Sequence, residues 1–135
     1  MKQILLLDDN DINLLILEHH ASMLGLCSKR FTEPLKALAY LETSTCDIII
    51  TDYMMPVMDG LSFVRALKDM NIKDVPIILS TAVENDDGLK EKAIEVGIDA
   101  FLPKPIDPTL FRTSVMALLK KRKSEIWDTG EKTPS

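Results

Sequence analysis

Polar residues able to bind an ion or to react follow several short apolar segments of this sequence. Asp8 and Asp9 follow 3–7, Asp52 follows 47–51, Thr81 follows 77–80, and Lys104 comes shortly after 98–102. Three carboxylates at one place repel one another unless positive charge lies among them. Mg²⁺ is a hard cation that prefers oxygen ligands, and a carboxylate beside it can attack phosphorus to give an aspartyl phosphate. The three carboxylates therefore indicate a site for a divalent cation at which one of them could act as a nucleophile toward phosphorus.

The two remaining residues fit the same chemistry. Phosphoryl transfer needs mainly positioning and charge neutralisation from a protein. The ammonium of Lys104 would supply charge, and the hydroxyl of Thr81 would donate a hydrogen bond to a phosphoryl oxygen.

Strand and helix patterns alternate along the chain and must position these residues. Strands are predicted at 3–7, 26–31, 47–51, 77–80 and 98–102, and helices at 11–25, 34–42, 61–69, 85–96 and from 107 onwards. Short apolar strands alternating with helices predict an α/β fold, a doubly wound five-stranded parallel sheet covered on both faces. Ligands of such sheets bind beyond the carboxyl ends of the strands, where the candidate residues lie.

Size, charge and cysteine content exclude several classes of protein. The 135 residues are enough for one domain, and the net charge of −5 argues against sequence-independent nucleic-acid binding. No apolar run approaches the length of a membrane span. Cys27 and Cys46 form no CxxC pair, so we expect reduced thiols and a cytoplasmic location.

The sequence resembles the response-regulator receiver family of two-component signalling. The resemblance covers about residues 2–120 and is carried by the motifs LLLDDN (5–10), DIIITDYMMPVMDG (47–60), ILSTA (78–82) and FLPKP (101–105). It implies a flavodoxin-like (βα)5 fold with strand order 2-1-3-4-5, helices 1 and 5 on one face and helices 2, 3 and 4 on the other. We expect a receiver domain over 1–121. Over 122–135 we expect a helix extension, linker or tail, with fraying after Leu119.

The resemblance also implies a role for each matching residue. Asp52 would be the phosphorylated aspartate, and Lys104 would be the lysine that contacts the phosphate. The ligands of Mg²⁺ (or Mn²⁺) would include Asp9 directly, Asp8 largely through water and Met54 through its backbone carbonyl. Thr81 would be the switch hydroxyl, and Phe101 would be the aromatic that swings inward on activation. Asp52 would bind the metal as well, and the Lys104–Pro105 bond would be cis.

The expected function is a phosphorylation-dependent signalling switch rather than an enzyme. A sensor histidine kinase or a histidine phosphotransfer protein would phosphorylate Asp52, and the surface formed by helix 4, strand 5 and helix 5 would change for a partner or an output domain. Membranes and nucleic acids are not expected partners. Met54 and Val83, two residues after Asp52 and Thr81, are apolar, which predicts slow loss of the phosphoryl group.

Two other classes fit the sequence less well. Phosphatases of the haloacid dehalogenase type need a DxD pattern, and residue 54 is Met. A flavodoxin-like FMN binder needs a loop rich in Ser, Thr or Gly after the first strand, where this chain has Asp8-Asp9-Asn10. A receiver that works without phosphate is disfavoured because every key residue type is present. His19 and His20 point about 100° apart on a helix, which is poor metal geometry.

Overall fold

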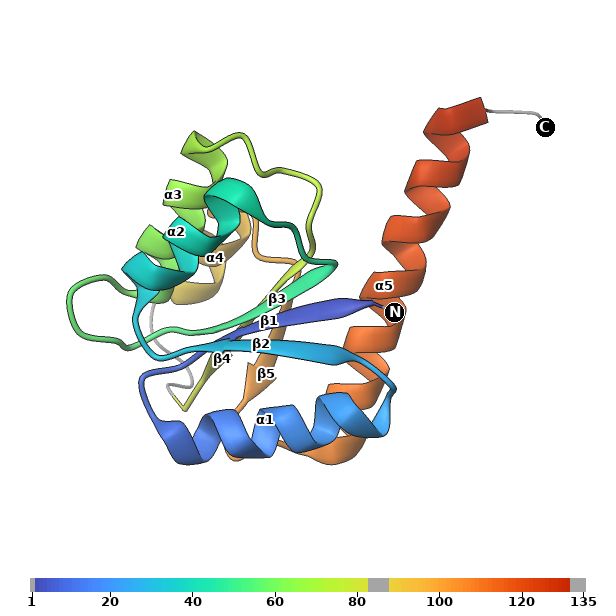
Figure 1. Ribbon diagram of the computed structural model, residues 1–135. Helices are drawn as coiled ribbons and strands as arrows, with labels where there is room; N and C mark the ends of the chain where they lie inside the picture. The colour runs from blue at the N-terminus through green and yellow to red at the C-terminus, as the bar shows by residue number, and fades with distance from the viewer. Residues whose placement is uncertain (1, 83–87, 132–135) are drawn as a thin grey trace.

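The fold alternates strands and helices around one sheet (Figure 1). This computed structural model describes residues 2–82 and 88–131, with side chains up to residue 120. The elements are β1 (Gln3–Leu7), α1 (Asp11–Met23), β2 (Cys27–Phe31), α2 (Pro34–Thr43), β3 (Ile48–Asp52), α3 (Gly60–Asp69), β4 (Ile77–Thr81), α4 (Leu89–Val96), β5 (Ala100–Pro103) and α5 (Pro108–Glu131). All strand pairs are parallel, in the order β2-β1-β3-β4-β5. The predicted fold class and strand order are therefore confirmed.

Alternation along the strands creates two apolar layers, one on each face of the sheet. Leu5, Leu7, Ile49, Ile77 and Leu79 pack against α2, α3 and α4, a side we call the α2–α4 face. Ile4, Leu6, Ile48, Ile50 and Ile78 pack against α1 and α5, on the α1–α5 face. Figure 1 shows the same division of the helices, as the resemblance implied. Because each fully buried Leu or Ile contributes about 1.5–3 kcal/mol, these layers hold the strand ends in fixed register.

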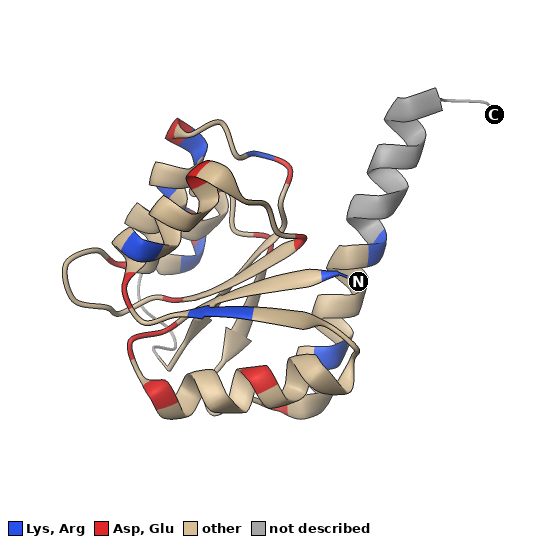
Figure 2. Cartoon of the chain, in the orientation of Figure 1, with Lys and Arg blue, Asp and Glu red and all other residues tan. Residues whose placement is uncertain are grey.

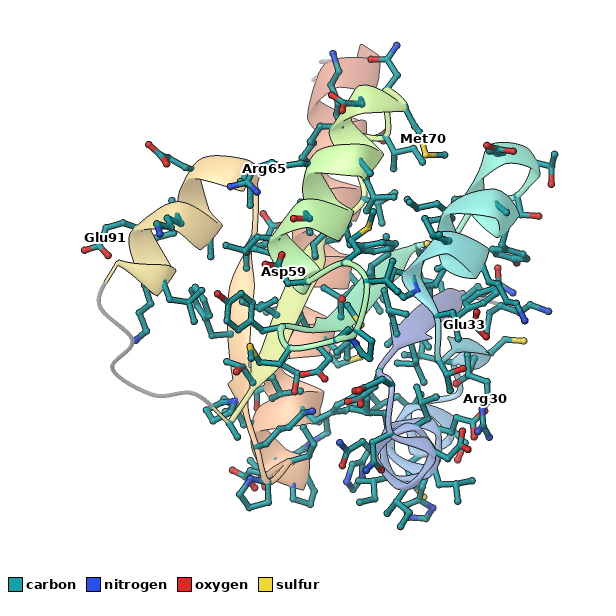
Figure 3. All side chains as sticks on the ribbon, turned by 90° about the vertical axis from the view of Figure 1, so that its left-hand side faces the viewer. Arg30, Glu33, Asp59, Arg65, Met70 and Glu91 are labelled. Carbon is teal, nitrogen blue, oxygen red and sulfur yellow. The ribbon has the colours of Figure 1, made fainter. Side chains whose placement is uncertain are left out.

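Side-chain caps start two helices directly beyond the strands. The Asn13 N–H donates to Asn10 Oδ1 (3.0 Å) at the start of α1, and the Ser62 N–H donates to Asp59 Oδ1 (2.8 Å) at the start of α3. Asp59 is labelled in Figure 3. Each cap satisfies an N–H that has no partner within its helix, so the chain turns sharply just after β1 and soon after β3.

Several element boundaries differ from the prediction, and three of the differences have an identifiable physical reason. The predicted helix 85–96 begins only at Leu89, because Gly88 precedes it in a left-handed conformation (φ 80°); residues 83–87 lie outside the described part of the chain. The predicted strand 98–102 is shifted to β5, because the Asp99 carboxylate accepts the Ile77 N–H (2.9 Å) before the strand begins. Helix α5 continues to Glu131 rather than fraying after Leu119, and the Lys, Arg and Glu residues that follow have high helix propensity.

Candidate functional site

The carboxyl ends of β1 and β3 bring three carboxylates together. These strands are neighbours, with Leu7 opposite Thr51, so the residues that come next are Asp8 and Asp52. Asp8, Asp9 and Asp52 each offer an oxygen within 4.8 Å of the others. Asp8 and Asp52 are buried, at 1% and 6% exposure, while Asp9 is exposed. The convergence predicted from the strand ends is therefore present.

Lys104 lies against this acidic cluster. Its Nζ donates to Asp8 Oδ2 (2.9 Å) and to Asp52 Oδ1 (3.0 Å). Burial raises the pKa of the Asp52 carboxyl and the charge of Asp8 adds to the rise, against the lowering effect of the Lys104 hydrogen bond. Burial would lower the pKa of Lys104, but its bonds to Asp8 and Asp52 outweigh burial and raise it. One ammonium therefore faces three carboxylates, and the cluster keeps an excess of negative charge.

The donor set of the cluster fits a hard divalent cation. Its three carboxylates supply oxygen ligands at one open edge of the sheet, which is the chemistry that Mg²⁺ and Mn²⁺ prefer. Among the described residues, no nitrogen or sulfur ligand belongs to the same group. The excess negative charge also favours a bound cation.

The loop between β3 and α3 is held tightly against Asp52. The Gly60 N–H donates to the Tyr53 carbonyl oxygen (2.8 Å), and the Tyr53 N–H donates to Asp52 Oδ1 (2.9 Å). Gly60 lies so close to the Asp52 backbone that an added Cβ would overlap its carbonyl oxygen. Asp52 Oδ1 is thus fixed from two directions, by the Tyr53 amide and by Lys104.

The same loop contains a strained turn at Val57. Its φ is 75°, and the Met58 N–H donates to the Pro56 carbonyl oxygen (2.8 Å), which closes a three-residue γ-turn. This left-handed conformation is unfavourable for a β-branched residue. The Val57 side chain is 87% exposed, so no burial offsets the strain.

Thr81 lies on β4, the strand next to β3, and Phe101 lies on β5, the strand beyond it. Thr81 is buried at the end of β4, and its carbonyl oxygen accepts the Lys104 N–H (3.1 Å). Phe101 is half-buried on the α2–α4 face, and Lys90 Nζ lies 5.7 Å from the centroid of its ring. The roles assigned to both residues, and to the Met54 carbonyl, remain predictions. The Met54 side chain is exposed, and Val83 lies outside the described residues.

The sequence interpretation missed one residue that the register places in the site. Ser80, not Thr81, is the β4 residue directly opposite Asp52. The signal was present, because a polar residue ends an otherwise apolar strand, but its importance depends on a strand pairing that the sequence does not state. The Lys104–Pro105 peptide is cis, as predicted. His19 is exposed and His20 packs against Phe111 (centroids 5.5 Å apart), positions at the surface and its boundary.

A doubly wound parallel sheet with an acidic, lysine-paired site at its carboxyl edge defines a class of α/β proteins. The sequence profile of one family, described as the response regulator receiver domain, matches residues 4–116. The chain belongs to this family, the receiver domains of two-component systems.

Known proteins agree with this assignment. The cyclic di-GMP phosphodiesterase response regulator RpfG of Xanthomonas campestris is 42% identical over 93 residues, covering 68% of this chain and 24% of RpfG. The receiver domain of Francisella response regulator 1452 is 26% identical, with a TM-score of 0.81 over 90% of this chain and 98% of that one. The receiver domain of the Pseudomonas aeruginosa histidine kinase PA1611, solved with magnesium in its active-site cleft, is 27% identical, with a TM-score of 0.79 over 88% and 98%.

The chain spans a quarter to a half of the length of the curated relatives it matches first. In the part of the chain that the structure describes, no helix combines the length and apolar character needed to cross a bilayer. Cys27 is exposed and Cys46 is buried, and they are not joined in a disulfide.

Proposed function

We propose that Asp52 accepts a phosphoryl group from a phosphohistidine of a sensor histidine kinase or a histidine phosphotransfer protein. An Asp52 oxygen attacks phosphorus and forms the O–P bond while the N–P bond breaks, and the electron pair stays on the imidazole nitrogen. The observation that carries this proposal is the buried Asp52 carboxylate, with Oδ1 held by Lys104 and Tyr53, inside a cluster of three carboxylates. The other oxygen of Asp52 is the one we assign as the nucleophile.

The surrounding residues would hold a cation and the phosphoryl group. Asp8, Asp9, Asp52 and the Met54 carbonyl would bind Mg²⁺ or Mn²⁺, which when bound supplies positive charge to the phosphoryl oxygens. Lys104 orients Asp52 before transfer, and its ammonium neutralises the added charge afterwards. Thr81, at the end of the neighbouring strand, donates its hydroxyl to a phosphoryl oxygen.

An apolar surface beside the cluster supports a protein as phosphodonor. Ile12, Leu15, Ile16 and Met23 are exposed and share the side of α1 opposite its buried residues. Met54 and Val57, on the loop after β3, are exposed apolar residues as well. Exposed apolar patches of this kind mark interaction surfaces. Lys and Arg are scattered over several elements in Figure 2, which does not favour a nucleic-acid partner.

The output is proposed to pass through the edge of the sheet at β5, with α4 on one face and α5 on the other. Movement of Thr81 toward the phosphoryl group would open space for Phe101, and the surface of α4, β5 and α5 would change for a partner or an output domain. We assign the receiver domain to residues 1–121 and a helix extension or linker to 122–135. The domain itself acts as a switch in the cytoplasm rather than as an enzyme on other substrates.

Phosphate incorporation tests the proposal. The purified protein is incubated with acetyl phosphate and MgCl₂, and intact-mass spectrometry follows the gain of one phosphoryl group. We expect incorporation in the wild type, none in Asp52→Asn and none in excess EDTA. Asp47→Asn is the matched control, because the Asp47 carboxylate accepts the Gln3 N–H at the opposite end of the sheet. Equal labelling of Asp52→Asn and the wild type would reject Asp52 as the acceptor.

A further inference from the structure

The Ser80 hydroxyl has no hydrogen-bond partner in the interior of the protein. Ser80 is 1% exposed, and among the side chains described its Oγ is the one buried polar atom without a partner. An unsatisfied buried hydroxyl destabilises a protein, and Ala would fill the same space without that cost. Buried polar groups without partners are rare enough in folded proteins that this one needs a physical explanation.

Strand register places this hydroxyl beside Asp52. Ser80 pairs with Asp52 on one side and with Leu102 on the other. Ile78 and Ile50 belong to the α1–α5 face, and side chains two residues further along a strand return to the same face. Ser80 and Asp52 are therefore adjacent on one face, on strands about 4.8 Å apart. Thr81, the next residue along β4, has the opposite parity.

Asp52 Oδ1 is already occupied in the unphosphorylated protein. It accepts hydrogen bonds from Lys104 Nζ (3.0 Å) and from the Tyr53 N–H (2.9 Å). A phosphoryl group on the other oxygen adds strong acceptors with about two negative charges, which attract the ammonium of Lys104. Oδ1 then becomes the carbonyl oxygen of an acyl phosphate. It keeps the Tyr53 N–H and has one lone pair open.

We infer that Ser80 is a positioning residue whose hydroxyl donates to Oδ1 of phosphorylated Asp52 once Lys104 has moved to the phosphoryl group. A hydroxyl hydrogen rotates freely to meet an acceptor, and Ser80 has no other bond to give up. This inference rests on the proposed function, because it needs Asp52 to be the acceptor.

The hydrogen bond from Ser80 to Oδ1 is expected to change the lifetime of the aspartyl phosphate in one direction. When water attacks phosphorus, the O–P bond breaks and its electron pair returns to the Asp52 carboxylate. Negative charge on Oδ1 therefore grows toward the transition state, and a donor to Oδ1 lowers the barrier. Ser80 shortens the lifetime of the phosphorylated form. Loss of one neutral hydrogen bond corresponds to a roughly three- to tenfold longer lifetime.

The test compares the wild type, Ser80→Ala and Ser80→Thr. Each is phosphorylated with acetyl phosphate and Mg²⁺, the donor is removed, and loss of the acyl phosphate is followed by intact-mass spectrometry. We expect a three- to tenfold longer lifetime for Ser80→Ala and a lifetime within twofold of the wild type for Ser80→Thr, which keeps the hydroxyl. An unchanged or shorter lifetime for Ser80→Ala overturns the inference, whether or not Ser80→Thr folds.

A second measurement separates positioning from general damage to the site. Calorimetric titration of Mg²⁺ into the unphosphorylated proteins is expected to give affinities within twofold of one another, because Ser80 is not one of the carboxylates that would hold the metal. A fivefold weaker affinity of Ser80→Ala would mean that the whole site had been disturbed, and would also overturn the inference. Failure of the proposed function looks different, since the wild type would then take up no phosphate or Asp52→Asn would still be labelled.

Discussion

Replacing Lys104 by Met removes the cation that separates two buried carboxylates. Met has about the same length and no charge, so the change isolates the ammonium. Lys104 bonds Asp8 at 2.9 Å and Asp52 at 3.0 Å, and its side chain is only 18% exposed. We expect Lys104→Met to fold but to be markedly less stable than the wild type in the absence of divalent metal.

The magnitude follows from the geometry of the pair. The two carboxylates offer oxygens no more than 4.8 Å apart, and two unit charges at that limit repel by about 3.5 kcal/mol at an effective dielectric constant of about 20. Removing one partner of a buried ion pair typically costs about 3–5 kcal/mol. Part of the charge is relieved by water that reaches Asp9 and the exposed part of the site, so we expect a loss of about 2–4 kcal/mol in the free energy of unfolding.

The pH dependence gives this prediction a distinct signature. The pKa of Asp52 is already raised by burial, and loss of the Lys104 hydrogen bond removes an opposing effect, so it rises further in the variant. A group whose pKa is higher in the folded state than in the unfolded state stabilises the folded protein at low pH. This stabilisation is lost as the pH rises through the pKa of the folded state. The destabilisation of Lys104→Met should therefore be small near pH 4 and grow toward pH 8, as the Asp reference pKa of about 4 requires.

Urea unfolding in EDTA, repeated across this pH range and with added MgCl₂, measures the effect. Mg²⁺ is expected to raise the stability of the variant more than that of the wild type, because it restores positive charge to the cluster. The matched control is Lys36→Met, whose partner Glu33 and own side chain are both largely exposed, and which should change stability by less than about 0.5 kcal/mol. Equal stability of Lys104→Met and the wild type at pH 8 in EDTA would refute the reasoning.

Three further substitutions test other parts of the site. Val57→Gly should raise the free energy of unfolding by about 0.5–1.5 kcal/mol in urea, because Gly relieves the left-handed strain of an exposed residue; Val57→Ala, which keeps the positive φ, should gain much less. Gly60→Ala should lower the free energy of unfolding by about 2–3 kcal/mol or more, since the added Cβ would meet the Asp52 carbonyl and Leu79 Cδ1 (2.9 Å). A variant as stable as the wild type would show that the loop moves freely. Met54→Asn should shorten the lifetime of the aspartyl phosphate, measured as for Ser80, because an amide in place of an exposed thioether helps to hold attacking water; a longer lifetime would contradict this.

Much of the acidic cluster was predictable because it depends on strand ends. Asp8 and Asp52 follow apolar runs, and parallel strands present their carboxyl ends at one edge. That β1 and β3 are neighbours, which brings the two residues together, was implied only by the resemblance. The order of strands came from the resemblance of the motifs, and the two faces then followed from alternation. These features depend on local pattern and on rules of chain topology, which a sequence expresses directly.

Ser80 and the helix boundaries were less predictable for physical reasons. The significance of Ser80 depends on which residue of β4 lies opposite Asp52, a register set by packing across the sheet. The start of α4 depends on the left-handed Gly88, and the shift of β5 depends on the Asp99 carboxylate that bonds the Ile77 amide. The register and the Asp99 bond are tertiary interactions, and the conformation of Gly88 is a local departure from the helix, so hydrophobic periodicity alone gives none of them.

The alternation along β4 has a consequence for how partners can bind. Asp8, Asp52 and Ser80 belong to the side of the sheet covered by α1 and α5, whereas Thr81 and Phe101 have the parity of the other side. One step along the chain, from Ser80 to Thr81, therefore changes the side of β4 to which the side chain belongs. A protein seated on α1 and a protein seated on α4 would contact opposite faces of the sheet and would not exclude each other. Substitutions on the two sides should therefore alter the receipt and the transmission of a signal independently.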